Sequence, residues 1–204
     1  MCIRYRFGVV PKKLWSRTNP ADQNNLCTWA MRSLLIENGE KLILIDTGIG
    51  NKQDDKFFSH YHLHGNDNLE KSLNNAGYSK DEVTDVFLTH LHFDHCGGAV
   101  HWKNNERTIL EPYFKNAIYW SNKEHWKWAI QPNPRERASF LKENISPIQE
   151  SGQLKFIERN GQFSRSVFPN MDVFFADGHT ESQMIPIIKY LSLIHISEPT
   201  RLSG

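Results

Sequence analysis

Residues 89–98 have the sequence THLHFDHCGG, the most informative stretch of the chain. Within six residues it places four side chains that are able to bind a divalent metal: His90, His92, Asp94 and His95. Imidazole and carboxylate groups are preferred nitrogen and oxygen ligands of zinc and similar ions. In an extended chain alternate side chains point to the same side, so His90 and His92 are expected to bind one ion. The spacing therefore predicts a metal centre rather than a polar turn of solvated histidines.

The residues on both sides of this stretch predict where it lies in the fold. Residues 85–89, DVFLT, are typical of a buried strand that leads directly into His90. Glycines at 97 and 98 let the backbone bend sharply, and a helix is expected to begin there. Asp94 and His95 come where the chain turns, so we expect them to face a position beside the one that His90 binds.

A β-hairpin is predicted upstream of the motif. The apolar segments 34–37 and 41–45 flank Asn38-Gly39, two residues that tolerate positive φ and favour a tight turn. The second strand ends at Asp46, which begins a flexible turn. The following residues 51–67 are polar. Their three histidines lack an adjacent acidic residue, so we expect a surface segment rather than a second metal site: His60, His62 and His64.

The rest of the chain mixes predicted helices and strands. Helices are expected over 69–76, from a capping box at 121–124 through an aromatic segment to 131, and over 138–144. A further capping box occupies 79–82, and strands are expected over 1–7, 117–120, 153–157, 173–176 and 184–190. Because this order lacks the regular strand–helix–strand alternation of a doubly wound sheet, the predicted class is α+β, with sheets packed on each other and helices outside.

Length and composition limit the kind of protein. The 204 residues, 39% of them hydrophobic, are enough for one domain with a sizeable core. A net charge of +1, from 24 basic and 23 acidic residues, points to neither a nucleic acid nor an anionic membrane as partner. The sequence shows neither a long apolar run nor a signal peptide, and its three scattered cysteines do not look like a disulfide framework. A cytoplasmic location is therefore expected. The oligomeric state is open.

Three segments together resemble the metallo-β-lactamase superfamily. Residues 89–98 match its H-x-H-x-D-H signature, DTG at 46–48 matches an upstream motif, and DGHT at 177–180 matches a downstream one. The resemblance extends over residues 30–190 and is closest to the branch of lactonases and organophosphate hydrolases. It implies an αββα sandwich over residues 1–190.

The resemblance also implies a role for each matching residue. His90, His92 and His179 would bind a first divalent ion, and Asp94 and His95 a second. Asp46 would orient these ligands through hydrogen bonds. Zinc is the expected metal, with iron and manganese as alternatives.

A metal-dependent hydrolase is the function that this ligand set implies. Two ions would activate a hydroxide that attacks an ester, lactone, amide, thioester or phosphoester bond of a small molecule, with Asp94 as the catalytic residue that holds or accepts a proton. Two alternatives stay open: a fragment that binds metal without catalysis, and a di-iron oxidoreductase of the same fold.

Two further ligands of the family, a bridging carboxylate and a last histidine, cannot be assigned. No aspartate follows Asp177, and His195 is the only histidine after His179. Residues 191–201, LSLIHISEPTR, match the translation of the end of a transposase sequencing adapter, so we expect 191–204 to be a non-native tail. The alternative is a native strand at 191–194. With such a tail the second half of the sandwich would be incomplete, and this chain would bind metal weakly and have impaired activity.

Overall fold

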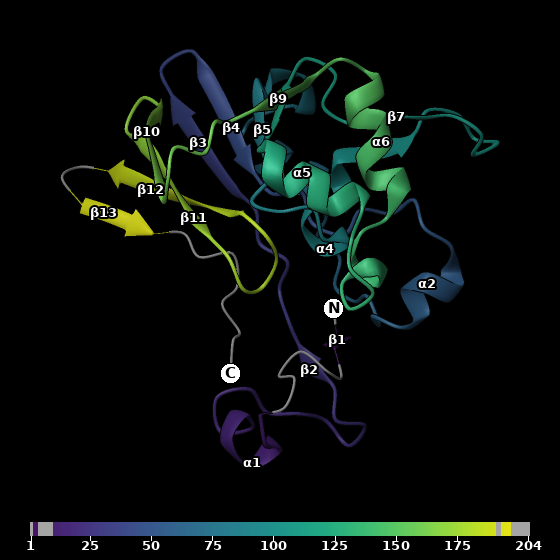
Figure 1. The fold of residues 1–204 in the computed structure, drawn as a ribbon. Helices are drawn as coiled ribbons and strands as arrows, with labels where there is room; N and C mark the ends of the chain where they lie inside the picture. The colour runs from purple at the N-terminus through teal and green to yellow at the C-terminus, as the bar shows by residue number, and fades with distance from the viewer. Residues whose placement is uncertain (1, 4–9, 191–192, 197–204) are drawn as a thin grey trace. The chain divides into compact units, whose positions relative to one another are not determined.

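The structure is a computed structural model, and it describes residues 2–3, 10–190 and 193–196 (Figure 1). The chain divides into two compact units. The smaller comprises Met1–Met31, Gln53–Asn66 and Thr200–Gly204, and the larger comprises Arg32–Lys52 and Asp67–Pro199. No helix in the described part is long and apolar enough to cross a membrane.

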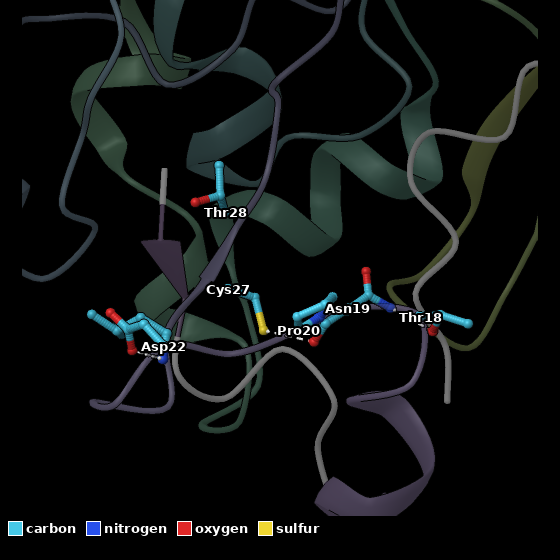
Figure 2. A pocket seen from close by; sticks show the side chains of 7 residues that line it. Thr18, Asn19, Pro20, Asp22, Cys27 and Thr28 are labelled. Atoms are coloured by element: carbon cyan, nitrogen blue, oxygen red, sulfur yellow. Dashed lines mark hydrogen bonds between the residues drawn. The ribbon is translucent and has the colours of Figure 1, made fainter.

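The described residues of the smaller unit form short elements: β1 (Cys2–Ile3), α1 (Lys12–Trp15), β2 (Cys27–Thr28) and α2 (Asp55–Ser59). β1 pairs antiparallel with β2, and most of the strand predicted over 1–7 lies outside the described residues. A pocket of about 430 Å³ lies beside β2, and Figure 2 shows the Cys27 thiol at its wall, which donates a hydrogen bond to the Asn19 carbonyl oxygen. The histidines of residues 60–64 are exposed in this unit, as expected for a surface segment.

A five-stranded sheet forms the centre of the larger unit. Its order is β3-β4-β5-β8-β9, with these bounds: β3 (Leu34–Asn38), β4 (Lys41–Ile45), β5 (Asp85–Phe87), β8 (Ile118–Ser121) and β9 (Leu154–Phe156). The predicted hairpin is confirmed, since β3 pairs antiparallel with β4 and Gly39 has a φ of +64° at the turn. The other neighbouring pairs are parallel, so the carboxyl ends of β4, β5, β8 and β9 meet at one edge of the sheet.

A second, antiparallel sheet has the order β10-β11-β12-β13. Its strands are β10 (Phe163–Phe168), β11 (Met171–Ala176), β12 (Gln183–Tyr190) and β13 (Leu193–Ile196). β13 pairs with β12 and lies within the predicted tail, of which residues 191–192 and 197–204 are outside the described chain. A two-stranded ribbon is formed by β6 (Val100–Trp102) and β7 (Leu110–Pro112).

Strand β4 shows how the layers pack. Its sequence KLILI is apolar on both faces because both faces are covered. Leu42 and Leu44 pack in one core cluster with residues of the helices, and Ile43 and Ile45 pack in another with residues of the second sheet. Figure 1 accordingly shows the five-stranded sheet between the β10–β13 sheet and helices α5 and α6. The described layers are therefore helix, sheet and sheet, which agrees with the predicted fold class.

Four α-helices are described in the larger unit: α3 (Leu69–Asn75), α4 (Phe93–Cys96), α5 (Lys123–Ile130) and α6 (Lys142–Glu150). Short 3-10 turns follow or precede them: η1 (Lys80–Glu82), η2 (Gly97–Ala99) and η3 (Arg137–Ser139). The predicted helix at 69–76 and the capping box at Ser79 and Glu82 are confirmed.

Two helix starts were predicted wrongly, and a third was predicted only in part. The α-helix α4 begins already at Phe93, and only the short 3-10 turn η2 begins at Gly97, where a helix was expected. α5 has Asn122 as its N-cap, whose side-chain oxygen accepts from a backbone N–H, so the capping box does not begin at residue 121. The helix predicted over 138–144 begins instead at Lys142, because Phe140 and Leu141 have extended ψ values of 107° and 121° that interrupt the helical path.

Candidate metal centre

The carboxyl ends of parallel strands bring the predicted site residues together. Asp46 follows β4 directly, His90 lies just beyond β5, and Asn122 follows β8. Ligands of open α/β sheets bind beyond this edge. The chain leaves β5 through buried residues 88–92 and then enters α4, with His92 as the residue before its first turn.

Three histidines converge at this edge: His90, His92 and His179. Each offers one ring nitrogen, and the three nitrogens lie within 4.8 Å of one another. The ring centres are 4.6 Å apart for His90 and His92, and 4.9 Å apart for His92 and His179. His90 and His92 are buried, whereas His179 is exposed, so solvent reaches the cluster from one side. The structure therefore places three of the five predicted metal-binding residues around one point.

The inner nitrogens of this cluster fit a metal ion. The Nε2 atoms of His90 and His92 are buried and have no hydrogen-bond partner among the described residues. A buried polar atom without a partner costs about 1–3 kcal/mol, so native proteins rarely leave one without a reason. Two such atoms, both imidazole nitrogens beside a third imidazole, have the chemistry of a zinc site.

The electrostatics keep both rings neutral. Burial lowers the pKa of His90 well below its usual value, and the neighbouring rings of His95 and His92 lower it further. Burial also lowers the pKa of His92 to about 4, and His179 acts in the same direction. Neutral imidazole is the form that binds a metal. At neutral pH these ligands therefore need not lose a proton first.

Asp46 orients two of the motif histidines. Its Oδ2 lies 2.8 Å from Nδ1 of His95, which donates to the carboxylate and so leaves Nε2 with its lone pair. The same Oδ2 accepts a bond of 2.7 Å from the Thr89 hydroxyl, which in turn lies 3.1 Å from Nδ1 of His90. Such outer hydrogen bonds fix the tautomer of a metal-binding histidine. The role predicted for Asp46, orienting metal ligands, stays a prediction.

Asp94 and His95 form a pair beside the three-histidine cluster. Oδ2 of Asp94 is 3.8 Å from Nε2 of His95, and the ring centres of His90 and His95 are 4.0 Å apart. Both predicted groups of ligands are thus adjacent, with Asp94 partly exposed at the rim.

Close backbone packing holds the motif against the turn that contains Asp46. The Thr47 N–H donates to the His95 carbonyl at 2.8 Å, and the Gly98 N–H donates to the Gly48 carbonyl at 2.9 Å. A Cβ at Gly97 would lie 2.1 Å from the Ile49 carbonyl oxygen. The glycines are therefore needed for contact between two backbones, and not only for the bend that the sequence suggested.

Two charged residues near the centre were not predicted from the sequence. Lys52 is buried, its ammonium donates to the Gly97 carbonyl, and burial lowers its pKa to about 8. Glu136 lies between α5 and α6, with Oε2 3.6 Å from Nε2 of His92. The contacts join residues 44 or more positions apart in the chain, so no local pattern signals them.

His125 and Cys96 are both buried beside the centre. Nε2 of His125 accepts a 2.8 Å bond from the Leu91 N–H, within the motif. The Cys96 thiol donates to the Leu91 carbonyl at 3.3 Å, and burial raises its pKa to about 12. Cys96 is thus the small buried residue that the sequence predicted.

His125→Gln is expected to remove part of the pH dependence of folding. Burial lowers the pKa of His125 from 6.5 to about 4. Between these values the unfolded chain binds a proton that the folded chain does not, so its contribution to stability is present above pH 6.5 and is lost as the pH falls towards 4. The loss is about 3 kcal/mol at about 1.4 kcal/mol per pH unit. Urea denaturation of the unchanged chain and of His125→Gln at pH 7 and pH 4 measures this loss. If the free energy of unfolding falls equally in both proteins between the two pH values, the lowered pKa of His125 is contradicted.

Comparisons with known proteins match much of the chain to one family. The sequence model of the metallo-beta-lactamase superfamily matches residues 32–166. An N-acyl homoserine lactonase of Bacillus cereus is 28% identical in an alignment of 128 positions, which covers 58% of this chain and 49% of the relative. One of Bacillus thuringiensis is 27% identical with the same coverage. The chain therefore spans about half the length of the curated relatives that it matches.

Solved structures match the fold over more of the chain. A probable metal-dependent hydrolase from Staphylococcus aureus has a TM-score of 0.82 at 25% identity, covering 96% of this chain and 67% of that one. A dizinc quorum-quenching lactonase in complex with a product has a TM-score of 0.60 at 26% identity, covering 80% of this chain and 54% of that one.

Proposed function

Because this chain belongs to the metallo-β-lactamase superfamily, we propose that it acts as a metal-dependent hydrolase at the cluster of His90, His92 and His179. One observation carries the proposal. The buried Nε2 atoms of His90 and His92 have no hydrogen-bond partner among the described residues, and they converge with a nitrogen of His179.

The three histidines would hold a first divalent ion, and Asp94 with His95 would hold a second. Imidazole and carboxylate ligands bind zinc, and such a site generally has a lower affinity for iron or manganese. Bound there, such ions lower the pKa of a water molecule and polarise the oxygen of a carbonyl or phosphoryl group. A dizinc lactonase among the structural neighbours supports two zinc ions as the expected content.

The chain's own residues would divide the remaining tasks. Asp46 fixes His95 directly, and His90 through Thr89, so both rings face the centre with a fixed tautomer. Asp94, at the partly exposed rim, is placed to hold or accept the proton that the attacking water loses. The exposed side of the cluster, at His179, is the side from which a substrate enters.

We propose a small-molecule lactone or other carboxylic ester as the substrate class. The curated relatives named above are N-acyl homoserine lactonases, and a lactone presents one carbonyl for polarisation and one ester oxygen as leaving group. Amide, thioester and phosphoester substrates use the same centre and stay as alternatives within the proposal.

Hydrolysis measured before and after removal of metal tests this function. The protein is treated with a chelator, dialysed, and assayed with an N-acyl homoserine lactone, an aryl ester and a phosphotriester, with and without added zinc. We expect lactone turnover that is low for this chain and that falls at least about tenfold without metal and returns with zinc. The proposal would be contradicted if the chelator left turnover unchanged, or if the zinc-loaded protein hydrolysed none of the three substrates.

A further inference from the structure

The first turn of α5 connects the two segments that carry the histidines of the centre. The Leu91 N–H, between His90 and His92, donates to Nε2 of His125 at 2.8 Å. On the other side of the same ring, Nδ1 lies 2.6 Å from the carbonyl oxygen of Glu181, two residues after His179. One buried imidazole therefore bridges two segments that are far apart in the chain.

Both ring nitrogens of His125 have a defined role. A backbone N–H only donates, so Nε2 accepts from Leu91, and the ring proton must be on Nδ1, where it is donated to the Glu181 carbonyl. The ring centre of His125 is 6.4 Å from that of His90. Although it is close to the cluster, His125 has no nitrogen left to bind a metal.

Asn122 extends the connection. Its side-chain NH₂ donates to the Ser182 carbonyl at 2.8 Å. Its side-chain oxygen accepts from the backbone N–H of His125, also at 2.8 Å. Successive carbonyls of the segment after His179 are thus held by one helical turn. Asn122 and His125 are both buried, so water does not compete for these bonds.

The same segment is also held at its start. Oδ1 of Asp177 accepts from the Ser182 N–H at 2.8 Å. Both oxygens of Asp177 accept from the guanidinium of Arg159, at 3.1 and 2.9 Å. His179 therefore lies in a short loop whose two ends are fixed. This loop is related to the motif by α5, and also by the Met184 N–H, which donates to the Thr89 carbonyl at 2.8 Å.

We propose that His125 is a positioning residue that sets the separation between the His90–His92 pair and His179. The inference rests on the proposed metal centre. Three ligands on two separate segments bind an ion tightly only if the segments are held in place beforehand, because otherwise binding must order them. Loss of the bridge should weaken metal binding even where the chain stays folded.

Three variants of His125 separate its two hydrogen bonds. His125→Phe keeps an aromatic ring and removes both bonds. His125→Gln places an amide near the position of Nε2, so it is able to accept from Leu91, and His125→Asn places an amide near Nδ1, so it is able to donate to Glu181. The matched control is Tyr119→Phe, which removes two buried hydrogen bonds that do not link the histidine segments, to the Phe114 N–H and the Ala99 carbonyl.

Zinc affinity of the 204-residue chain is measured by competition with a chromophoric chelator, and the absorption spectrum of the cobalt-loaded chain reports the geometry. Kd for zinc is expected to rise about 10- to 100-fold in His125→Phe, as for other outer contacts of metal ligands, with a changed cobalt spectrum. His125→Gln and His125→Asn should recover part of the loss, and Tyr119→Phe should lower stability without changing Kd.

His90→Ala, measured alongside, separates the two proposals. If His90→Ala loses zinc while the His125 variants all keep the Kd and cobalt spectrum of the unchanged chain, the positioning role is refuted and the metal centre stands. If His90→Ala itself keeps the zinc affinity, the proposed centre is wrong, and the role of His125 is refuted with it.

Discussion

Replacing His90 with alanine is expected to abolish zinc binding at the centre, with a Kd at least about 100-fold higher than that of the unchanged chain. His90 is the centre of the cluster, since its ring lies within about 5 Å of the rings of His92, His95 and His179. Its Nε2 is buried and has no hydrogen-bond partner among the described residues. Removing it leaves two histidines on separate segments, which cannot hold an ion as three do.

The control for His90→Ala is His62→Ala. Both remove one imidazole, but His62 is exposed in the smaller unit. Calorimetric or chelator-competition titration of the two variants should give a large loss for His90→Ala and no change for His62→Ala. Equal losses, or none in either, would show that zinc binds the chain elsewhere or not at all.

Replacing Gly97 with alanine is expected to lower the free energy of unfolding by about 3 kcal/mol or more. The added Cβ would lie 2.1 Å from the oxygen and 2.5 Å from the carbon of the Ile49 carbonyl. These are backbone atoms, so no side-chain rotation relieves the overlap. Gly97 has an ordinary helical φ of −59°, so the whole cost comes from contact and none from backbone conformation.

Gly77→Ala provides the comparison, because at Gly77 the backbone conformation is unfavourable for alanine while the space for a Cβ is open. Gly77 has a φ of +88°, which disfavours alanine, but nothing lies within 4 Å of its would-be Cβ. That variant should cost about 1–2 kcal/mol from conformation alone. Urea midpoints that are equal for the two variants would contradict the packing account. Because Gly97 packs against the turn after Asp46, its variant should also weaken zinc binding, whereas Gly77→Ala should not.

The elements with strong local signals were predictable. Asn38-Gly39 between apolar segments marks the hairpin, and the apolar run before His90 marks β5. β10 was missed because Phe168 is its one fully buried residue, so the strand shows no alternation of apolar and polar side chains. The start of α6 was missed because the extended backbone of residues 140–141 has no clear sequence signal.

The candidate site was predictable as far as its motifs are local. His90 and His92 lie two residues apart in one segment, and the structure brings His179 to them across more than eighty residues of chain. The family resemblance predicted that His179 lies beside His90 and His92, whereas the spacing of the residues in the sequence did not. The contacts of His125, Lys52 and Glu136 depend on how separate segments pack, and a buried histidine between two backbone groups looks in sequence like any helical histidine.

Anomalous diffraction at the zinc edge, from crystals of the chain grown with zinc, tests the central claim most directly. We expect a strong peak about 2.0–2.1 Å from one ring nitrogen each of His90, His92 and His179. A map without a peak among these three rings, or with its strongest peak at the exposed histidines of residues 60–64, would contradict the account.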